Sequence, residues 1–140
     1  LAREYPEVNF IIPHLGSFAD YWRAQLALID HLVRHPNVFT DTSGVRRFDL
    51  LEQALTRAGP HKLLFGSDGP WLHPGVELAK VHALELPPRE AALVLGGNLL
   101  RLVNRAGLQR RPPGPITPRS VATEVAPRDP WEPVAEILVQ

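Results

Sequence analysis

The sequences VNFIIPHLGS at residues 8–17 and KLLFGSDGP at residues 62–70 are the best indication of how this chain folds. In each, a short continuous apolar run is bounded by Gly and Pro, which is typical of a strand buried on both faces of a parallel sheet. His14 and Asp68 follow these runs. Because the carboxyl ends of such strands carry the active sites of βα barrels and open α/β enzymes, both residues are candidates for a functional site.

Strands and helices alternate along most of the chain. Strands are predicted over residues 8–13, 38–43 and 62–66, the second from its β-branched and aromatic side chains. Apolar stripes and Pro or Gly signals predict helices over residues 18–34, 49–58, 74–83, 88–95 and 98–107, the last with Asn98 as its N-cap. This order indicates βα units around a parallel sheet, which is an α/β fold. Asp41 lies within the second strand, where a structural carboxylate is the expected role.

The chain is too short for a closed barrel. Its 140 residues suffice for one domain with a core, whereas a complete eight-stranded βα barrel holds about 250 residues. Three strands cannot close such a barrel. The sequence contains no Met and begins with Leu1, so we expect a piece of a longer protein or an incomplete gene product.

The composition changes after Gly107. Residues 110–133 hold seven Pro and few large apolar side chains, which is typical of an extended segment that forms no packed core. Apolar residues with the spacing of a short terminal helix follow at Trp131, Val134, Ile137 and Leu138. We therefore predict a folded domain at residues 1–107 and a Pro-rich tail at residues 108–140.

Charge and composition exclude several classes of partner. The 15 basic and 15 acidic residues balance, so no strong positive field favours nucleic acid or an anionic membrane. The absence of Cys excludes disulfides and thiolate metal sites. No apolar run approaches the ~20 residues of a membrane span, and no signal-peptide pattern is present. We expect a cytoplasmic globular protein that binds a small-molecule substrate and neither nucleic acid nor a membrane.

Four motifs in this order resemble the C-terminal portion of the amidohydrolase-related metal-dependent hydrolases. This family has a βα-barrel fold and includes the aminocarboxymuconate-semialdehyde decarboxylases and related aromatic-acid decarboxylases. The motifs are YPEVNFIIPHLG at residues 5–16, NVFTDTSG at 37–44, LFGSDGP at 64–70 and LGGN at 95–98. The third motif is the most specific, and the order and spacing of all four strengthen the match.

The resemblance implies that the three strands are strands 6–8 of a (β/α)8 TIM barrel. Asp68 then matches the family's metal-ligand aspartate, and His14 matches the histidine that activates metal-bound water or polarises the substrate. The implied cofactor is a divalent metal, most often zinc. The family's His-x-His after the first strand and its histidine after the fifth are not in this chain. At most two metal ligands are therefore present, and the isolated chain is expected to bind metal weakly or not at all.

Each candidate residue also has a structural interpretation. His14 is alternatively a core histidine bonded to a carbonyl, and Asp68 a turn residue before Gly-Pro. Three further residues are candidates for substrate contact, or else ordinary loop residues: Ser43, Trp71 and His73. His31 and His35 have the four-residue spacing of a helical metal pair, but no acidic partner supports that role.

Two functions follow from these observations. The first is the C-terminal part of a metal-dependent hydrolase or decarboxylase that acts on a small carboxylic acid, ester, lactone or amide. Its catalytic residues are His14 and Asp68, and Asp68 also binds the metal. The second is a non-catalytic remnant or interaction module without a complete metal site. The exposed edge of the first strand favours pairing, so a homo-oligomer or a missing N-terminal half is expected to complete the sheet.

Overall fold

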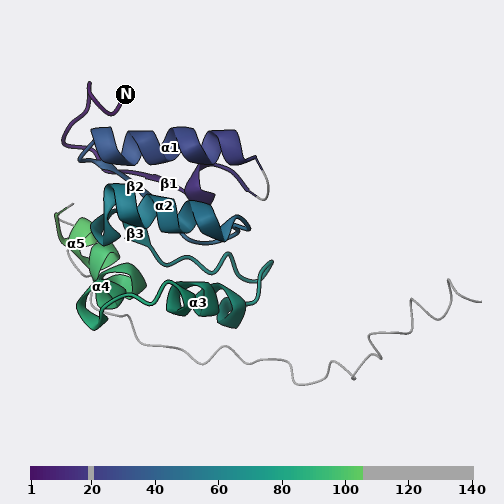
Figure 1. The fold of residues 1–140 in the computed structure, drawn as a ribbon. Helices are drawn as coiled ribbons and strands as arrows, with labels where there is room; N and C mark the ends of the chain where they lie inside the picture. The colour runs from purple at the N-terminus through teal and green to yellow at the C-terminus, as the bar shows by residue number, and fades with distance from the viewer. Residues whose placement is uncertain (19–20, 106–140) are drawn as a thin grey trace, which may run out of the picture. The chain divides into compact units, whose positions relative to one another are not determined.

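The computed structural model describes residues 1–18 and 21–105, and these form a three-stranded parallel sheet with helices between the strands (Figure 1). The strands are β1 (Phe10–Ile12), β2 (Val38–Asp41) and β3 (Leu63–Leu64), in the spatial order β1-β2-β3. Phe10 pairs with Val38, and Thr40 pairs with Leu63. The α/β order and the parallel sheet predicted from the sequence are thus present.

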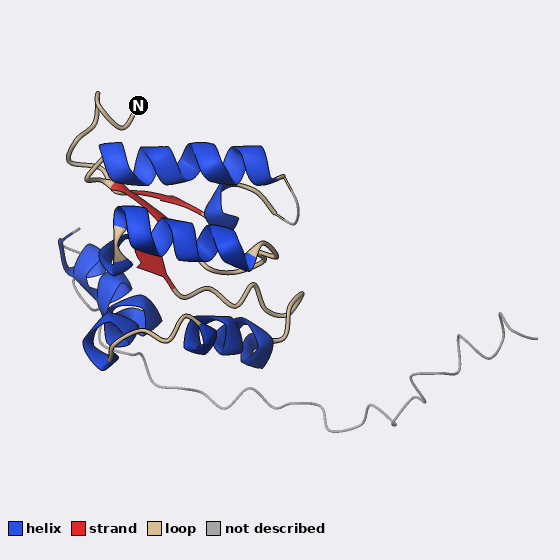
Figure 2. Ribbon diagram, viewed as in Figure 1, coloured by secondary structure: helices blue, strands red, loops and turns tan. Residues whose placement is uncertain are grey.

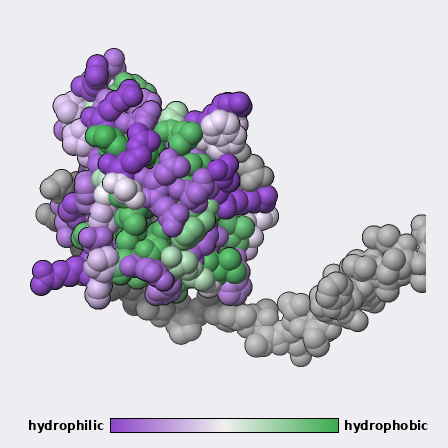
Figure 3. Space-filling model, viewed as in Figure 1, coloured by the Kyte–Doolittle hydropathy of each residue, from purple (hydrophilic) through white to green (hydrophobic). Residues whose placement is uncertain are grey.

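Helices α1 (Trp22–Arg34) and α2 (Phe48–Ala58) make the two connections between the strands. They lie side by side in front of the sheet in the view of Figure 2. Apolar residues at three- and four-residue steps face the strands, and each such residue adds about 1.5–3 kcal/mol when fully buried. The core contains Leu15, Ile29, Leu32, Leu51, Ala54 and Leu63, all 0% exposed. On the face shown in Figure 3, hydrophilic side chains are mixed with smaller apolar patches.

After β3 the chain continues through α3 (Pro74–Ala83), α4 (Pro88–Ala92), a π-helical segment η3 (Leu93–Gly97) and α5 (Asn98–Arg105). The predicted N-cap role of Asn98 is wrong, because Asn98 has helical dihedral angles of φ −64° and ψ −46°. Its fully buried amide instead donates to the carbonyls of Pro60 at 2.8 Å and Leu63 at 2.7 Å. These bonds attach α5 to the start of β3.

Strand β1 differs from its prediction. Phe10 is half-buried, but Ile11 and Ile12 are 44% and 37% exposed, so this strand is not buried on both faces. The reason is that β2 is its only partner strand within the described residues. Strand β2, which has a neighbour on each side, is buried from Val38 to Thr40 as expected. Helix α1 begins at Trp22, later than the predicted position 18.

Within residues 1–18 and 21–105, no helix is both long enough and apolar enough to cross a membrane. The predicted boundary near Gly107, the Pro-rich tail at residues 108–140 and the terminal helix around Trp131 lie outside the described residues.

Candidate functional site

His14 lies two residues beyond the end of β1, in the short 3₁₀ turn η1 (His14–Gly16). Three consecutive residues of this turn have positive φ: His14 at 56°, Leu15 at 51° and Gly16 at 90°. Left-handed backbone costs roughly 1–2 kcal/mol at each non-Gly residue. The complete burial of Leu15 and a 3.0 Å hydrogen bond from the His14 backbone N–H to Asp41 Oδ1 offset this cost.

Asp41, the last residue of β2, organises the strand ends through one carboxylate oxygen. Oδ1 accepts hydrogen bonds from the backbone N–H of His14 at 3.0 Å, the backbone N–H of Ser43 at 3.0 Å and the Ser43 hydroxyl at 2.8 Å. This is the structural role that the sequence predicted for Asp41. The carboxylate therefore joins the loop after β1 to the loop after β2.

The imidazole of His14 is held through one nitrogen. Nδ1 lies 3.0 Å from the Ser43 carbonyl oxygen and 3.0 Å from the Ser43 hydroxyl oxygen. The ring of Phe18 meets the imidazole edge-on, with centroids 5.2 Å apart. No hydrogen-bond partner of Nε2 is found within residues 1–18 and 21–105. His14 is thus oriented at Nδ1, while Nε2 has no partner among the described residues.

Two glycines allow this close packing. At Gly44, where φ is 64°, a Cβ atom would lie 2.9 Å from the Phe18 ring and 3.2 Å from His14 Nδ1. At Gly66, two residues beyond β3, a Cβ atom would lie 3.0 Å from Asp41 Cγ and 3.1 Å from Ser43 Cβ. Sequence reasoning missed both glycines as supports of the site, although a Gly at a strand end often marks a close approach.

Two side chains of helix α3 hold the loop after β2 in place. Glu77, 4% exposed, accepts a 3.1 Å hydrogen bond from the Gly44 backbone N–H and pairs with Lys80 at 2.7 Å. Lys80 also donates to the carbonyls of Thr42 and Val45, each at 3.1 Å. Sequence reasoning missed this pair as well; its signal was the Glu–Lys spacing of three residues in a predicted helix.

The structure brings His14 and Ser43 together, but it argues against the predicted contact between Ser43 and substrate. Ser43 is only 2% exposed, and its hydroxyl is already shared between His14 and Asp41. Its position supports His14 instead.

Asp68, Trp71 and His73 lie in the segment between β3 and α3. Asp68 has a φ of 50° and is partly buried, and its carboxylate has no hydrogen-bond or ion-pair partner within the described part of the chain. Trp71 is 86% exposed. His73 accepts a 3.1 Å hydrogen bond from the Gly75 backbone N–H through Nδ1 and so caps α3. None of the three is hydrogen-bonded to His14 or Ser43.

The described residues do not fit a complete metal site. Among residues 1–18 and 21–105, no three His, Asp or Glu side chains come close enough to hold an ion. A structural or catalytic zinc takes at least three protein ligands. His31 and His35 stack with their centroids 5.5 Å apart, without a third ligand. A metal at Asp68 therefore needs ligands from outside the described residues.

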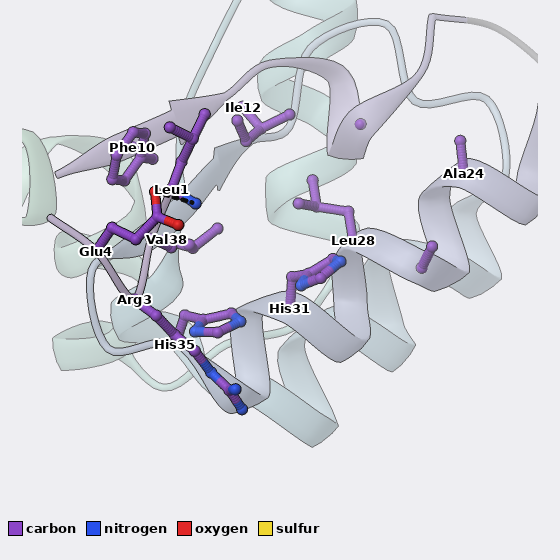
Figure 4. A pocket seen from close by; sticks show the side chains of 13 residues that line it. Leu1, Arg3, Glu4, Phe10, Ile12, Ala24, Leu28, His31, His35 and Val38 are labelled. Carbon is purple, nitrogen blue, oxygen red and sulfur yellow. Dashed lines mark ion pairs between the residues drawn. The ribbon is translucent and has the colours of Figure 1, made fainter. Parts of the chain in front are cut away.

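A cavity of about 630 Å³ lies between β1, α1 and the N-terminal segment (Figure 4). Phe10, Ile12, Val38 and Leu28 line it, and His31 and His35 lie along the α1 side. Neither His14 nor Asp68 belongs to its lining. The cavity therefore marks an incompletely covered apolar layer next to β1, and its lining does not include Asp41 or Ser43 either.

Several solved structures share this fold. An amidohydrolase from Burkholderia multivorans with bound zinc matches with a TM-score of 0.60 and 20% identity, over 74% of this chain and 46% of that one. A 2,6-dihydroxybenzoate decarboxylase from Rhizobium matches with a TM-score of 0.56 and 20% identity, over 75% and 37%. A Polaromonas dihydroxybenzoic acid decarboxylase, with bound manganese and 2-nitroresorcinol, matches with a TM-score of 0.56 and 20% identity, over 77% and 38%.

The chain spans less than half the length of each of these proteins. At 20% identity the likeness establishes the fold, an α/β arrangement that corresponds to part of the amidohydrolase fold. No curated protein matches the sequence. A family model described as Amidohydrolase matches residues 1–105, which include β1, β2 and β3 and the His14 and Asp68 loops. This chain belongs to the amidohydrolase family.

Proposed function

We propose that this chain supplies strands 6–8 of an amidohydrolase (β/α)8 barrel and, with them, part of the active site of a metal-dependent hydrolase or decarboxylase. Family membership over residues 1–105 supports this proposal. So does the position of His14 after β1 and of Asp68 after β3, at the carboxyl ends of parallel strands. The substrate is a small carboxylic acid, ester, lactone or amide.

The observation that carries the proposal is the way His14 is held. A group that transfers protons must be fixed in orientation while its reacting atom stays open. Ser43 holds Nδ1 at 3.0 Å, and Nε2 has no partner within the described residues. In decarboxylation the bond to the carboxylate breaks, carbon dioxide leaves and the carbon takes up a proton, which His14 can give only while Nε2 carries one. In hydrolysis the attacking water loses a proton, which a bare Nε2 can accept. We assign both proton transfers to His14 Nε2.

Asp68 is proposed as a metal ligand because its partly buried carboxylate has no partner within the described residues. A bound divalent ion, zinc or manganese, supplies Lewis-acid chemistry. Since the described residues bring no three ligands together, the others come from a missing N-terminal half or from a second copy of the chain. The exposed Trp71 and His73, in the segment after Asp68, are proposed to contact substrate.

A second candidate function is a non-catalytic remnant or interaction module. The absence of three clustered ligands within the described residues and the exposed edge of β1 favour it. The two candidates differ in what the surrounding reading frame encodes. An upstream His-x-His supports the enzyme, and its absence supports the remnant.

Turnover by the product of the complete reading frame tests the proposal. The protein is loaded with zinc or manganese and assayed with 2,6-dihydroxybenzoate for carbon dioxide release, and with a panel of esters, lactones and amides for hydrolysis. We expect turnover in one of these assays. His14→Ala should lower kcat about 10²–10⁴-fold with metal retained. Asp68→Ala should abolish turnover and deplete the metal.

His82→Ala, which removes an exposed histidine of α3, is the matched control and should leave kcat unchanged. Equal metal loss in the His14 and Asp68 variants would make His14 a ligand as well. No turnover with either metal on any of these substrates would refute the enzyme and favour the remnant.

A further inference from the structure

We propose that Ser43 and Asp41 fix the tautomer of His14, so that the neutral imidazole carries its proton on Nδ1 and presents a bare Nε2. The proposal deepens the proposed function, on which its catalytic meaning rests. Its structural content concerns three residues at the ends of β1 and β2 and needs no metal or substrate. Ser43 and Asp41 are positioning residues in this scheme, because they act on the reacting nitrogen only through His14.

The two Ser43 oxygens beside His14 Nδ1 can only accept hydrogen bonds, and this determines the tautomer. The Ser43 carbonyl oxygen, 3.0 Å from Nδ1, can only accept a hydrogen bond. The Ser43 hydroxyl gives its single proton to Asp41 Oδ1 at 2.8 Å, so its oxygen can only accept from Nδ1, which lies 3.0 Å away. Both partners therefore need the proton on Nδ1. A bare Nδ1 would face two lone pairs and leave buried groups unsatisfied, at a cost of about 1–3 kcal/mol.

Asp41 keeps the Ser43 hydroxyl in the accepting orientation. Its Oδ1 also binds the backbone N–H groups of His14 and Ser43, so the carboxylate cannot rotate away without breaking three hydrogen bonds. Gly66 packs against it, since a Cβ atom there would lie 3.0 Å from Asp41 Cγ. The Ser43 hydroxyl therefore donates its proton to Asp41, and both Ser43 oxygens near the imidazole act as hydrogen-bond acceptors.

The hydrogen bond made by His73 requires the opposite tautomer from that of His14. The backbone N–H of Gly75 donates to His73 Nδ1 at 3.1 Å, so this nitrogen must be bare and the proton must be on Nε2. His14 and His73 are therefore expected to hold opposite tautomers in the same protein. Because neutral imidazole in water does not require either form, the difference reports the hydrogen bonds that each ring makes.

Nitrogen NMR of the ¹⁵N-histidine-labelled 140-residue chain tests the inference. Spectra are recorded at about pH 9, where histidine is normally neutral, and signals are assigned with His14→Ala and His73→Ala. We expect a protonated Nδ1 and a bare Nε2 at His14, and the reverse at His73. A bare Nδ1 at His14, or two averaged nitrogen shifts, would overturn the inference.

Variants of Ser43 test the mechanism. Ser43→Ala removes one acceptor and should move both His14 nitrogen shifts toward the average of the two tautomers, whereas Ser43→Thr keeps the hydroxyl and should restore the wild-type shifts. Asp41→Ala frees the hydroxyl proton and should have the same effect as Ser43→Ala; if it does not fold, the Ser43 pair decides. Ser17→Ala, which removes a hydroxyl whose partner among the described residues is the Phe18 carbonyl, is the matched control and should change nothing.

An unchanged spectrum in Ser43→Ala would mean that the Ser43 carbonyl alone determines the His14 tautomer, and it would refute the role of the hydroxyl. Since the measurement requires neither metal nor turnover, its outcome is independent of the assay proposed above. If the product of the complete reading frame is inactive but His14 and His73 show the expected tautomers, the proposed enzymatic function is refuted and the inference about the His14 tautomer still holds.

Discussion

The Ser43 hydroxyl lies 3.0 Å from Nδ1 of His14, although the two residues are 29 positions apart in the sequence. The contact crosses from the loop after β2 to the loop after β1 and is anchored by Asp41 at the end of β2. The orientation of the imidazole therefore depends on the packing of two successive βα units. Substitutions that move one βα unit relative to the other should therefore change the orientation of the His14 imidazole.

Zinc should bind the 140-residue chain weakly or not at all. His14 and Asp68 offer at most two ligands, which leaves the ion mostly hydrated, and no three ligands cluster within the described residues. Calorimetric titration with zinc measures this directly. His31→Ala, which removes one of the stacked histidines on α1, is the control for adventitious binding. Sub-micromolar affinity that disappears in His14→Ala or Asp68→Ala would contradict the expectation and indicate a site completed by oligomerisation.

Gly66→Ala should destabilise the fold by about 1–3 kcal/mol, as is typical of overpacking. The added Cβ atom would meet Asp41 Cγ at 3.0 Å and Ser43 at 3.1 Å, and both groups are held by hydrogen bonds. Urea unfolding gives the free energy of unfolding. Gly69→Ala is the matched control, since its nearest neighbour would be Ser67 Oγ at 3.6 Å. Equal stability of the two variants would show that the strand ends are looser than this packing implies.

Lys62→Met should lower the free energy of unfolding by about 1–3 kcal/mol. The Lys62 ammonium group donates to the carbonyls of His35 at 2.6 Å, Pro36 at 2.9 Å and Val38 at 3.0 Å, just beyond the end of α1. A thioether cannot donate, so the Pro36 and Val38 carbonyls lose this donor, while the His35 carbonyl keeps the Val38 backbone N–H at 3.3 Å. Arg89→Met, on the exposed side of α4, is the control and should change stability by less than about 0.5 kcal/mol.

The contribution of Lys62 to the free energy of unfolding should depend on pH. Burial lowers the pKa of Lys62 below its ordinary value of 10.5. Between the two values the unfolded chain binds more protons than the folded chain, so the Lys62 contribution to stability rises with pH. The stability difference between wild type and Lys62→Met should therefore grow as the pH increases toward 10.5. A difference that shrinks over this range would mean that the folded protein favours the charged form.

Ile11→Lys should reduce self-association of the chain. Ile11 is 44% exposed on β1, whose outer edge has no partner strand in the described part of the chain, and charged side chains block pairing at such edges. Sedimentation velocity over a range of concentrations measures the effect. Val33→Lys adds the same charge at an apolar residue of α1 that is 51% exposed and should leave association unchanged. A wild-type chain that stays monomeric at every concentration would refute association through this edge.

Sequence alone was sufficient for the local features of the fold. Apolar runs bounded by Gly and Pro located the strands, and apolar stripes located α1 and α2, because both depend on periodicity within a few residues. The same local signals placed His14 and Asp68 at strand ends. The motifs also led to the family that the model match over residues 1–105 establishes.

Only the tertiary structure decided how the site is held. The His14–Ser43 contact, the Glu77–Gly44 hydrogen bond and the buried amide of Asn98 join residues 29 to 38 positions apart. No local pattern encodes such contacts, because they arise when separate βα units pack together. Likewise, the apolar run of β1 predicted burial on both faces, yet burial depends on which neighbours are present. Ile11 stays exposed because β2 is the only strand beside it within the described residues.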